Sequence, residues 1–166
     1  MGIRTEYFAA PTDEVAATAL HTPGGPSEPD LRTDQPRFDA VAVPSVDPFV
    51  MLGGLAGVLS GRPYAEVTAH PRHGALVGSG GEEGPWVVTV SQILVDDLAS
   101  AGPTRLAAAA REWSGDATPA VAPQVLVSAL LSLGALAARA ADERKSVYCW
   151  TSLTDEDREP TKRTPS

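Results

Sequence analysis

Apolar residues recur at three- and four-residue spacing along residues 123–142, and this is the strongest pattern in the chain. The recurring positions are Val125, Leu126, Ala129, Leu130, Leu133, Leu136, Ala137 and Ala140. This spacing predicts a helix, and Pro123 suits its first turn, where a missing N–H leaves no bond unmade. Further apolar residues widen the stripe almost around the helix, so we expect it to be a buried central helix. Arg139 ends the run before the roughly 20 apolar residues that a bilayer requires, which disfavours a membrane span.

A strand rich in aromatic residues is predicted directly after this helix, at residues 146–153. Alternation places Val147, Cys149 and Thr151 on one face and Tyr148, Trp150 and Ser152 on the other. Because both faces carry bulky side chains, we expect an interior strand that is covered on both sides. The helix and this strand together form the predicted core of the fold.

Weaker patterns predict the remaining elements. Strands are expected at 2–9, 38–43, 75–77 and 86–90, and helices at 12–20, 47–61, 91–101 and 104–113. Ser91 is the expected N-cap of its helix, and Gly61 a C-terminal stop. Gly53, Gly54 and Gly57 weaken their helix, and we expect them to be tolerated where a neighbouring element packs closely against that face. No element is predicted within residues 62–73.

The order of these elements predicts the fold class. Strand, helix, strand, helix, two strands, three helices and a strand do not repeat as β-α-β units, so an α+β fold is expected. We predict a single domain over residues 1–153, with a mixed or antiparallel sheet packed against several helices around helix 123–142. A Pro- and Gly-rich stretch at 21–36 is predicted to be a flexible loop, and the charged tail at 154–166 to be disordered.

Composition narrows the class of protein. The 166 residues are 43% hydrophobic, enough for a real core, and carry a net charge of -8. Such a charge argues against nucleic-acid binding and fits a soluble protein whose partner is a basic protein. The single Cys149 excludes an internal disulfide, and the N-terminus has no apolar signal segment. We therefore expect the cytoplasm, and the lack of Asn with an Arg preference suggests a bacterium with a GC-rich genome.

Two histidines provide the first candidate site. His70 and His73 lie three residues apart, near Glu66, Glu82 and Glu83 in the sequence. Metal sites use such ligands, but Pro71 disfavours the helix that would align the two imidazoles, and no further ligand has a fixed spacing. A solvated loop is the favoured interpretation, and no metal or cofactor is predicted.

Other candidates also have ordinary interpretations. The glycines at 78–81 resemble an anion-binding loop but lack the Lys and Ser/Thr of a phosphate loop. Cys149 sits in an apolar strand, where a cysteine is usually inert. Trp86, Trp113 and Trp150 lie in periodic apolar segments, which favours core packing over a ligand pocket. The acids at 96–97 and 155–157 are expected to be solvated.

Several segments together resemble the YfbM-like family of small uncharacterised bacterial proteins. They are Met1-Gly2-Ile3 with an aromatic strand, Leu59-Ser60-Gly61-Arg62-Pro63 at a helix end, the helix start Val90-Ser91, and an Ala-rich helix before a final strand. The resemblance covers most of the chain and implies an α+β fold, but it implies no chemistry. The loop near residue 30 and the hydrophilic tail depart from the family pattern.

No catalytic constellation emerges, so the first hypothesis is a non-catalytic protein-binding module of the adaptor, regulator or immunity type. The alternative is a small-molecule-binding protein or hydrolytic enzyme with a pocket near loops 63–73 and 78–85. The candidate binding residues of that pocket are His70, His73, Glu82 and Trp86. Composition does not distinguish these two classes.

Overall fold

The computed structural model describes residues 2–21, 25–27, 38–43, 50–81, 84–116 and 123–154. Most of the predicted loop at 21–36, the predicted helix start at Asp47 and the predicted tail beyond Thr154 lie outside these residues. Glu82 and Glu83 also lie outside them. Everything below concerns the described residues.

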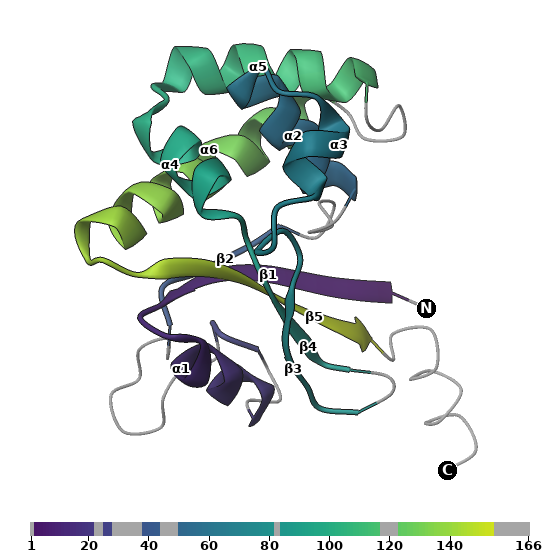
Figure 1. The fold of residues 1–166 in the computed structure, drawn as a ribbon, viewed down its shortest axis with the longest axis vertical. Helices are drawn as coiled ribbons and strands as arrows, with labels where there is room; N and C mark the ends of the chain where they lie inside the picture. The colour runs from purple at the N-terminus through teal and green to yellow at the C-terminus, as the bar shows by residue number, and fades with distance from the viewer. Residues whose placement is uncertain are drawn as a thin grey trace.

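Five strands form one antiparallel sheet in the order β2-β1-β5-β4-β3 (Figure 1). They are β1 (Gly2–Ala10), β2 (Ala40–Ala42), β3 (Leu76–Ser79), β4 (Trp86–Thr89) and β5 (Ser146–Thr154). β1 and β5 pair along their full lengths, from Gly2 opposite Thr154 to Ala10 opposite Ser146. The sheet is antiparallel throughout its described part, and the α+β class is confirmed.

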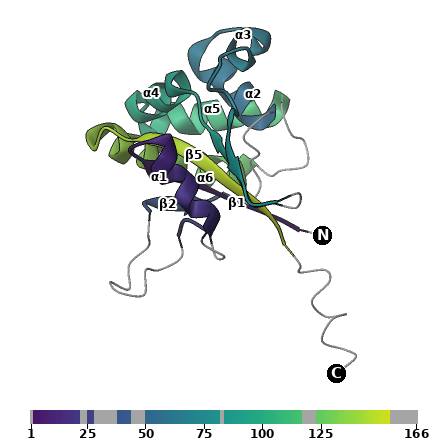
Figure 2. The ribbon, with the colours of Figure 1, turned by 60° about the horizontal axis from the view of Figure 1, so that its bottom comes forward.

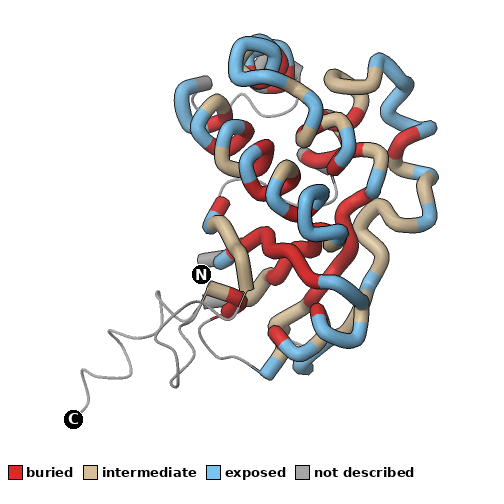
Figure 3. Tube along the Cα trace, turned by 90° about the vertical axis from the view of Figure 1, so that its left-hand side faces the viewer, coloured by how far each residue is buried: buried red, intermediate tan, exposed pale blue. Residues whose placement is uncertain are grey.

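Helices cover both faces of this sheet. α2 (Val50–Ser60), α3 (Tyr64–Thr68), α4 (Gln92–Ser100), α5 (Pro103–Asp116) and α6 (Pro123–Asp142) gather on one side. α1 (Asp13–Ala17) and the 3₁₀ turn η1 (Thr18–His21) lie on the other side, as Figure 2 shows. Buried residues concentrate in the sheet and on the inward sides of the helices (Figure 3).

α6 is the central helix that the apolar pattern predicts, with the predicted bounds. It packs against α4, α5 and the sheet, and seven of the eight residues of its predicted stripe are buried. The prediction was wrong for Val125, which is 46% exposed because it faces an open groove beside Ala42 and Val43. α6 is the one described helix long and apolar enough to cross a membrane, and its buried residues belong to the larger hydrophobic cluster.

The two faces of β5 are buried in two separate hydrophobic clusters, as expected for an interior strand. Val147 and Cys149 belong to the cluster under α2 and α4–α6. Tyr148 and Trp150 belong to the smaller cluster under α1, where Phe8 packs 5.7 Å from the Tyr148 ring. β5 therefore joins the two halves of the core.

The short helix α3 is missing from the sequence prediction, since only Val67 in it is buried and no apolar period marks it. Gly53 of α2 explains how α3 docks. A Cβ at Gly53 would lie 2.8 Å from Cγ2 of Thr68 and 2.8 Å from Cε2 of Tyr64. The close neighbour expected for this glycine is therefore α3. At the end of α2, Gly61 adopts φ 74° and donates its N–H to Gly57, which confirms the predicted stop.

Candidate functional site

A pocket of about 260 Å³ opens between the end of α2, α3 and the start of α4. We call it the α3–α4 pocket. Its polar lining residues are Arg62, Glu66, His70 and Ser91, and its apolar lining residues are Ala56, Val67, Ala69, Ile93 and Leu94. A few convergent polar groups over an apolar floor are typical of small-ligand sites. The pocket occupies part of the region 63–73 named by the sequence.

The two charged groups at the rim of the pocket come from α3 and from the residues just before it. Arg62 precedes the helix and Glu66 lies one turn later, so the guanidinium and the carboxylate face each other. Their nearest atoms, Nη1 and Oε1, are 3.7 Å apart, and the side chains are 50% and 58% exposed. Such a long, exposed ion pair contributes little to stability, and it can open without cost to the fold.

His70 follows α3 and is oriented by the backbone. Its Nδ1 accepts a hydrogen bond of 3.1 Å from the backbone N–H of Arg72. In the neutral imidazole the proton therefore resides on Nε2, which becomes a hydrogen-bond donor. No described residue bonds Nε2, so this donor is available to a ligand in the pocket.

The N-terminus of α4 forms the opposite wall. Ser91 is the N-cap residue by position, as predicted, but its side chain does not cap the helix. Ser91 is only 5% exposed, and its hydroxyl has no hydrogen-bond partner among the described residues. The first-turn N–H groups of α4, including those of Ile93 and Leu94, lack intrahelical acceptors. The predicted N-cap position of Ser91 is confirmed, and the capping hydrogen bond expected of its side chain is absent from the described residues.

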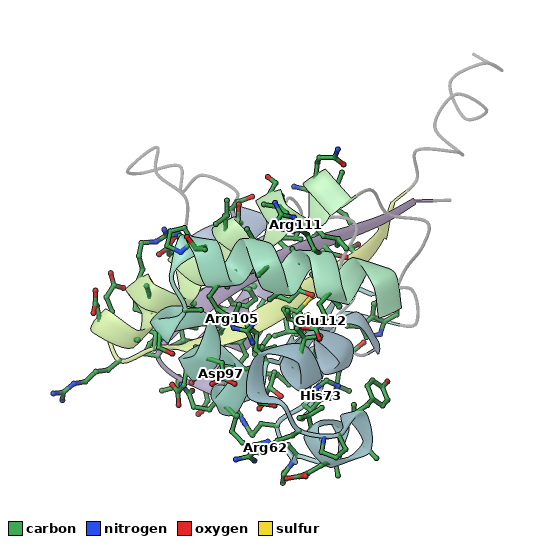
Figure 4. The ribbon with its side chains drawn as sticks, turned by 90° about the horizontal axis from the view of Figure 1, so that it is seen from above. Arg62, His73, Asp97, Arg105, Arg111 and Glu112 are labelled. Atoms are coloured by element: carbon green, nitrogen blue, oxygen red, sulfur yellow. The ribbon has the colours of Figure 1, made fainter. Side chains whose placement is uncertain are left out.

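Asp97 lies one turn further along α4, with Oδ2 buried and unpartnered within the described residues. Burial, followed by the neighbouring charge of Asp96, raises the pKa of Asp97, while the positive charge of Arg62 opposes that rise. Figure 4 shows Asp97 on α4 with Arg62 beyond it toward the rim of the molecule. Asp96 and Asp97 therefore place two carboxyl groups one turn beyond the start of α4.

The other predicted site residues do not join His70. His73 lies over α2, with its Cε1 3.5 Å from where a Gly53 Cβ would be, and it does not line the pocket (Figure 4). Trp86 is half-buried at the start of β4 and packs over Gly84. Glu82 lies outside the described residues. Of the three predicted binding residues that the structure describes, only His70 lines the pocket.

The three tryptophans occupy separate places. Trp113 of α5 is fully buried in the cluster on the helix side of the sheet. Trp150 of β5 is buried in the cluster on the opposite face. Cys149 is fully buried, with its Sγ 3.5 Å from Oγ1 of Thr151. Over the part of the chain that the structure describes, no three His, Cys, Asp or Glu side chains gather in a group that could hold a metal ion.

A buried carboxylate on the α1 side is also absent from the sequence prediction. Glu6 is 1% exposed, accepts a bond of 2.9 Å from Arg4 and another of 3.0 Å from the backbone N–H of Ser27. The Arg4 guanidinium lies 5.6 Å from the centre of the Trp150 ring. These contacts tie residues 25–27 to β1, and both Glu6 oxygens are satisfied by this structural role.

A second, shallower groove of about 350 Å³ runs between the end of β2 and the first half of α6. Its walls carry no charged side chain, and the exposed Val125 lies in it. Residues 44–49 and 117–122 adjoin its walls in the sequence and lie outside the described residues. We assign it no role.

Comparison of the chain with protein-family models, with curated proteins and with solved structures found no match. The resemblance to the YfbM-like family stays a prediction. Any function must therefore be argued from the geometry of the α3–α4 pocket.

Proposed function

We propose that this protein binds a small molecule in the α3–α4 pocket. One observation carries the proposal: Ser91, a residue only 5% exposed, lines the pocket, and its hydroxyl makes no hydrogen bond to any described residue. A ligand in the pocket can bond this hydroxyl without displacing a partner within the described residues. Arg62, Glu66 and His70 supply further polar contacts around it.

The proposed role is binding without hydrolysis. A hydrolytic serine needs a base within hydrogen-bond reach and a group that orients the base. Within the described residues Ser91 and His70 share no hydrogen bond, and Nδ1 of His70 is occupied by the N–H of Arg72. This imidazole is held as a donor to a ligand, and no described carboxylate orients it as a base.

The protein-binding hypothesis from the sequence stays a prediction, as do the cytoplasmic location and the bacterial origin. The small-molecule alternative is the one proposed, and its support is the set of polar residues over the apolar floor of the α3–α4 pocket.

The experiment is a thermal-shift panel of free amino acids, small carboxylates, amines and phosphates, run on wild type and two variants. Ala69→Trp places an indole in the pocket, since Ala69 is exposed and lines it. Ala65→Trp is the matched control, because Ala65 is exposed on the same helix and does not line the pocket. A ligand at 100 times its Kd raises the free energy of unfolding by about 2.7 kcal/mol.

The proposal expects at least one compound to raise the Tm of wild type and of Ala65→Trp, and to leave that of Ala69→Trp unchanged. It is overturned if no compound raises the wild-type Tm. It is equally overturned if Ala69→Trp responds as strongly as wild type.

A further inference from the structure

Hydrogen-bond donors outnumber acceptors among the polar side chains that line the α3–α4 pocket. The first-turn N–H groups of α4, the Ser91 hydroxyl and the Arg62 guanidinium are all donors, and His70 adds Nε2. Helix N-termini favour negative charge, and a guanidinium matches the two oxygens of a carboxylate. The α4 end of the pocket therefore suits an anionic group.

The charges around the pocket limit how negative that ligand can be. Glu66 lines the same pocket, and Asp96 and Asp97 lie one turn along α4. Arg62 is the one permanently positive side chain in the lining. A dianionic phosphate would be repelled by these carboxylates, whereas a single carboxylate accompanied by a cationic group would satisfy Arg62 and Glu66 together.

The size and floor of the pocket limit the rest of the ligand. Its 260 Å³ falls below the ~300–1,000 Å³ of pockets for drug-sized molecules. Ala56, Val67, Ile93 and Leu94 give it apolar walls. A short aliphatic group fits these walls, and a nucleotide exceeds the space.

Building on the proposed function, we propose that the ligand is a zwitterionic α-amino acid with an aliphatic side chain. Its carboxylate lies at the α4 N-terminus, against Ser91 and Arg62. Its ammonium group lies against Glu66, and its side chain against Ile93 and Leu94. The exposed Arg62–Glu66 ion pair opens to receive the two charged ends of the ligand.

The test is calorimetric titration at pH 7 with three compounds that share the same branched five-carbon chain. L-Leucine carries both charged groups, 4-methylpentanoate lacks the amine, and 3-methylbutylamine lacks the carboxylate. We expect L-leucine to bind at least about tenfold more tightly than either analogue, a difference of about 1.4 kcal/mol.

Two exposed variants separate the charged contacts. Glu66→Gln is expected to weaken L-leucine and to strengthen 4-methylpentanoate, because the repulsion of the lone carboxylate is removed. Arg62→Gln is expected to weaken both compounds by about tenfold. Glu14→Gln and Arg144→Gln are the controls, as both residues are exposed and lie outside the pocket, and neither should change any affinity.

Each outcome decides one proposal. If 4-methylpentanoate binds as tightly as L-leucine, or if Glu66→Gln leaves their ratio unchanged, the amino-acid assignment is wrong. If none of the three compounds binds while another member of the panel is blocked by Ala69→Trp, the assignment fails and the proposed function stands. If no compound of either set binds, both fail.

Discussion

The Tyr148 hydroxyl donates a hydrogen bond of 2.6 Å to Oδ1 of Asp13, 135 residues earlier in the chain. The same carboxylate accepts two bonds from the guanidinium of Arg72, at 2.8 and 2.9 Å. The backbone N–H of Arg72 in turn donates to His70. The contacts of Asp13 therefore connect α1, the central strand β5 and the turn that holds His70 in the α3–α4 pocket.

Tyr148→Phe should lower the free energy of unfolding by about 1 kcal/mol, the usual net worth of one hydrogen bond. For a chain of this size that corresponds to a Tm lower by about 2–4 °C. Burial and the Asp13 carboxylate raise the pKa of Tyr148 to about 12, so its hydroxyl is a neutral donor at neutral pH. Tyr64→Phe is the control, because Tyr64 is 49% exposed. Equal Tm values for the two variants in thermal unfolding would contradict the assigned role.

Lowering the pH should weaken the contribution of Asp13 to the free energy of unfolding. Hydrogen bonds from Arg72 and Tyr148 lower the pKa of Asp13 from 3.8 to about 2. Because the folded pKa is the lower one, the stabilisation is full above 3.8 and is lost as pH falls toward 2. The Asp13 side chain is 45% exposed, so we expect its ionised form to contribute less than about 1 kcal/mol to the free energy of unfolding.

Urea unfolding of wild type and Asp13→Asn at several pH values measures this contribution. The difference between them should be constant at neutral pH and shrink between 3.8 and 2. A difference that grows on acidification would contradict the role assigned to Arg72.

Two leucines of α6 test whether this helix is the core. Leu136 is fully buried and Leu131 is 41% exposed. Leu136→Ala should lower the free energy of unfolding by about 2–5 kcal/mol, as truncation of a buried leucine usually does. Leu131→Ala should stay within about 0.5 kcal/mol of wild type. Chemical unfolding measures both, and equal losses would show that α6 is not buried as described.

Gly53→Leu should destabilise the docking of α3. The added side chain meets Thr68 and Tyr64 at once, and overpacking of this kind costs about 1–3 kcal/mol. Because α3 carries Glu66, ligand binding in the pocket should weaken as well. Gly102→Ala is the control, since nothing lies within 4 Å of its added Cβ. Full binding with an unchanged Tm in Gly53→Leu would show that α3 docks elsewhere.

The helices and strands could be predicted where buried apolar residues recur at regular spacing. α6 and β5 bury nearly every residue that the spacing selects, so their positions could be inferred from apolar residues alone. α3 could not, because a five-residue helix held by a glycine contact leaves no periodic signal. The pocket could not be predicted for the same reason, because Arg62 and Glu66 are brought to the same pocket as Ser91 by the position of α3.

The helix start at Ser91 shows the limit of local reasoning. A serine at this position normally accepts a bond from the first turn, and the sequence alone predicts that bond. Here the hydroxyl stays unpartnered among the described residues and lines a pocket. The residue type of His70 indicates a candidate site residue. The orientation of its imidazole, however, depends on the backbone N–H of Arg72, two residues later.

The central claim is that an amino acid binds at the N-terminus of α4, and amide NMR of the isotope-labelled protein tests it most directly. On titration with L-leucine, the backbone N–H signals of Ile93 and Leu94 should shift most, because a carboxylate would accept from the first turn of this helix. The same titration of Ala69→Trp should leave those signals unchanged. Saturating L-leucine that leaves the Ile93 and Leu94 signals in place in the wild type would contradict the account.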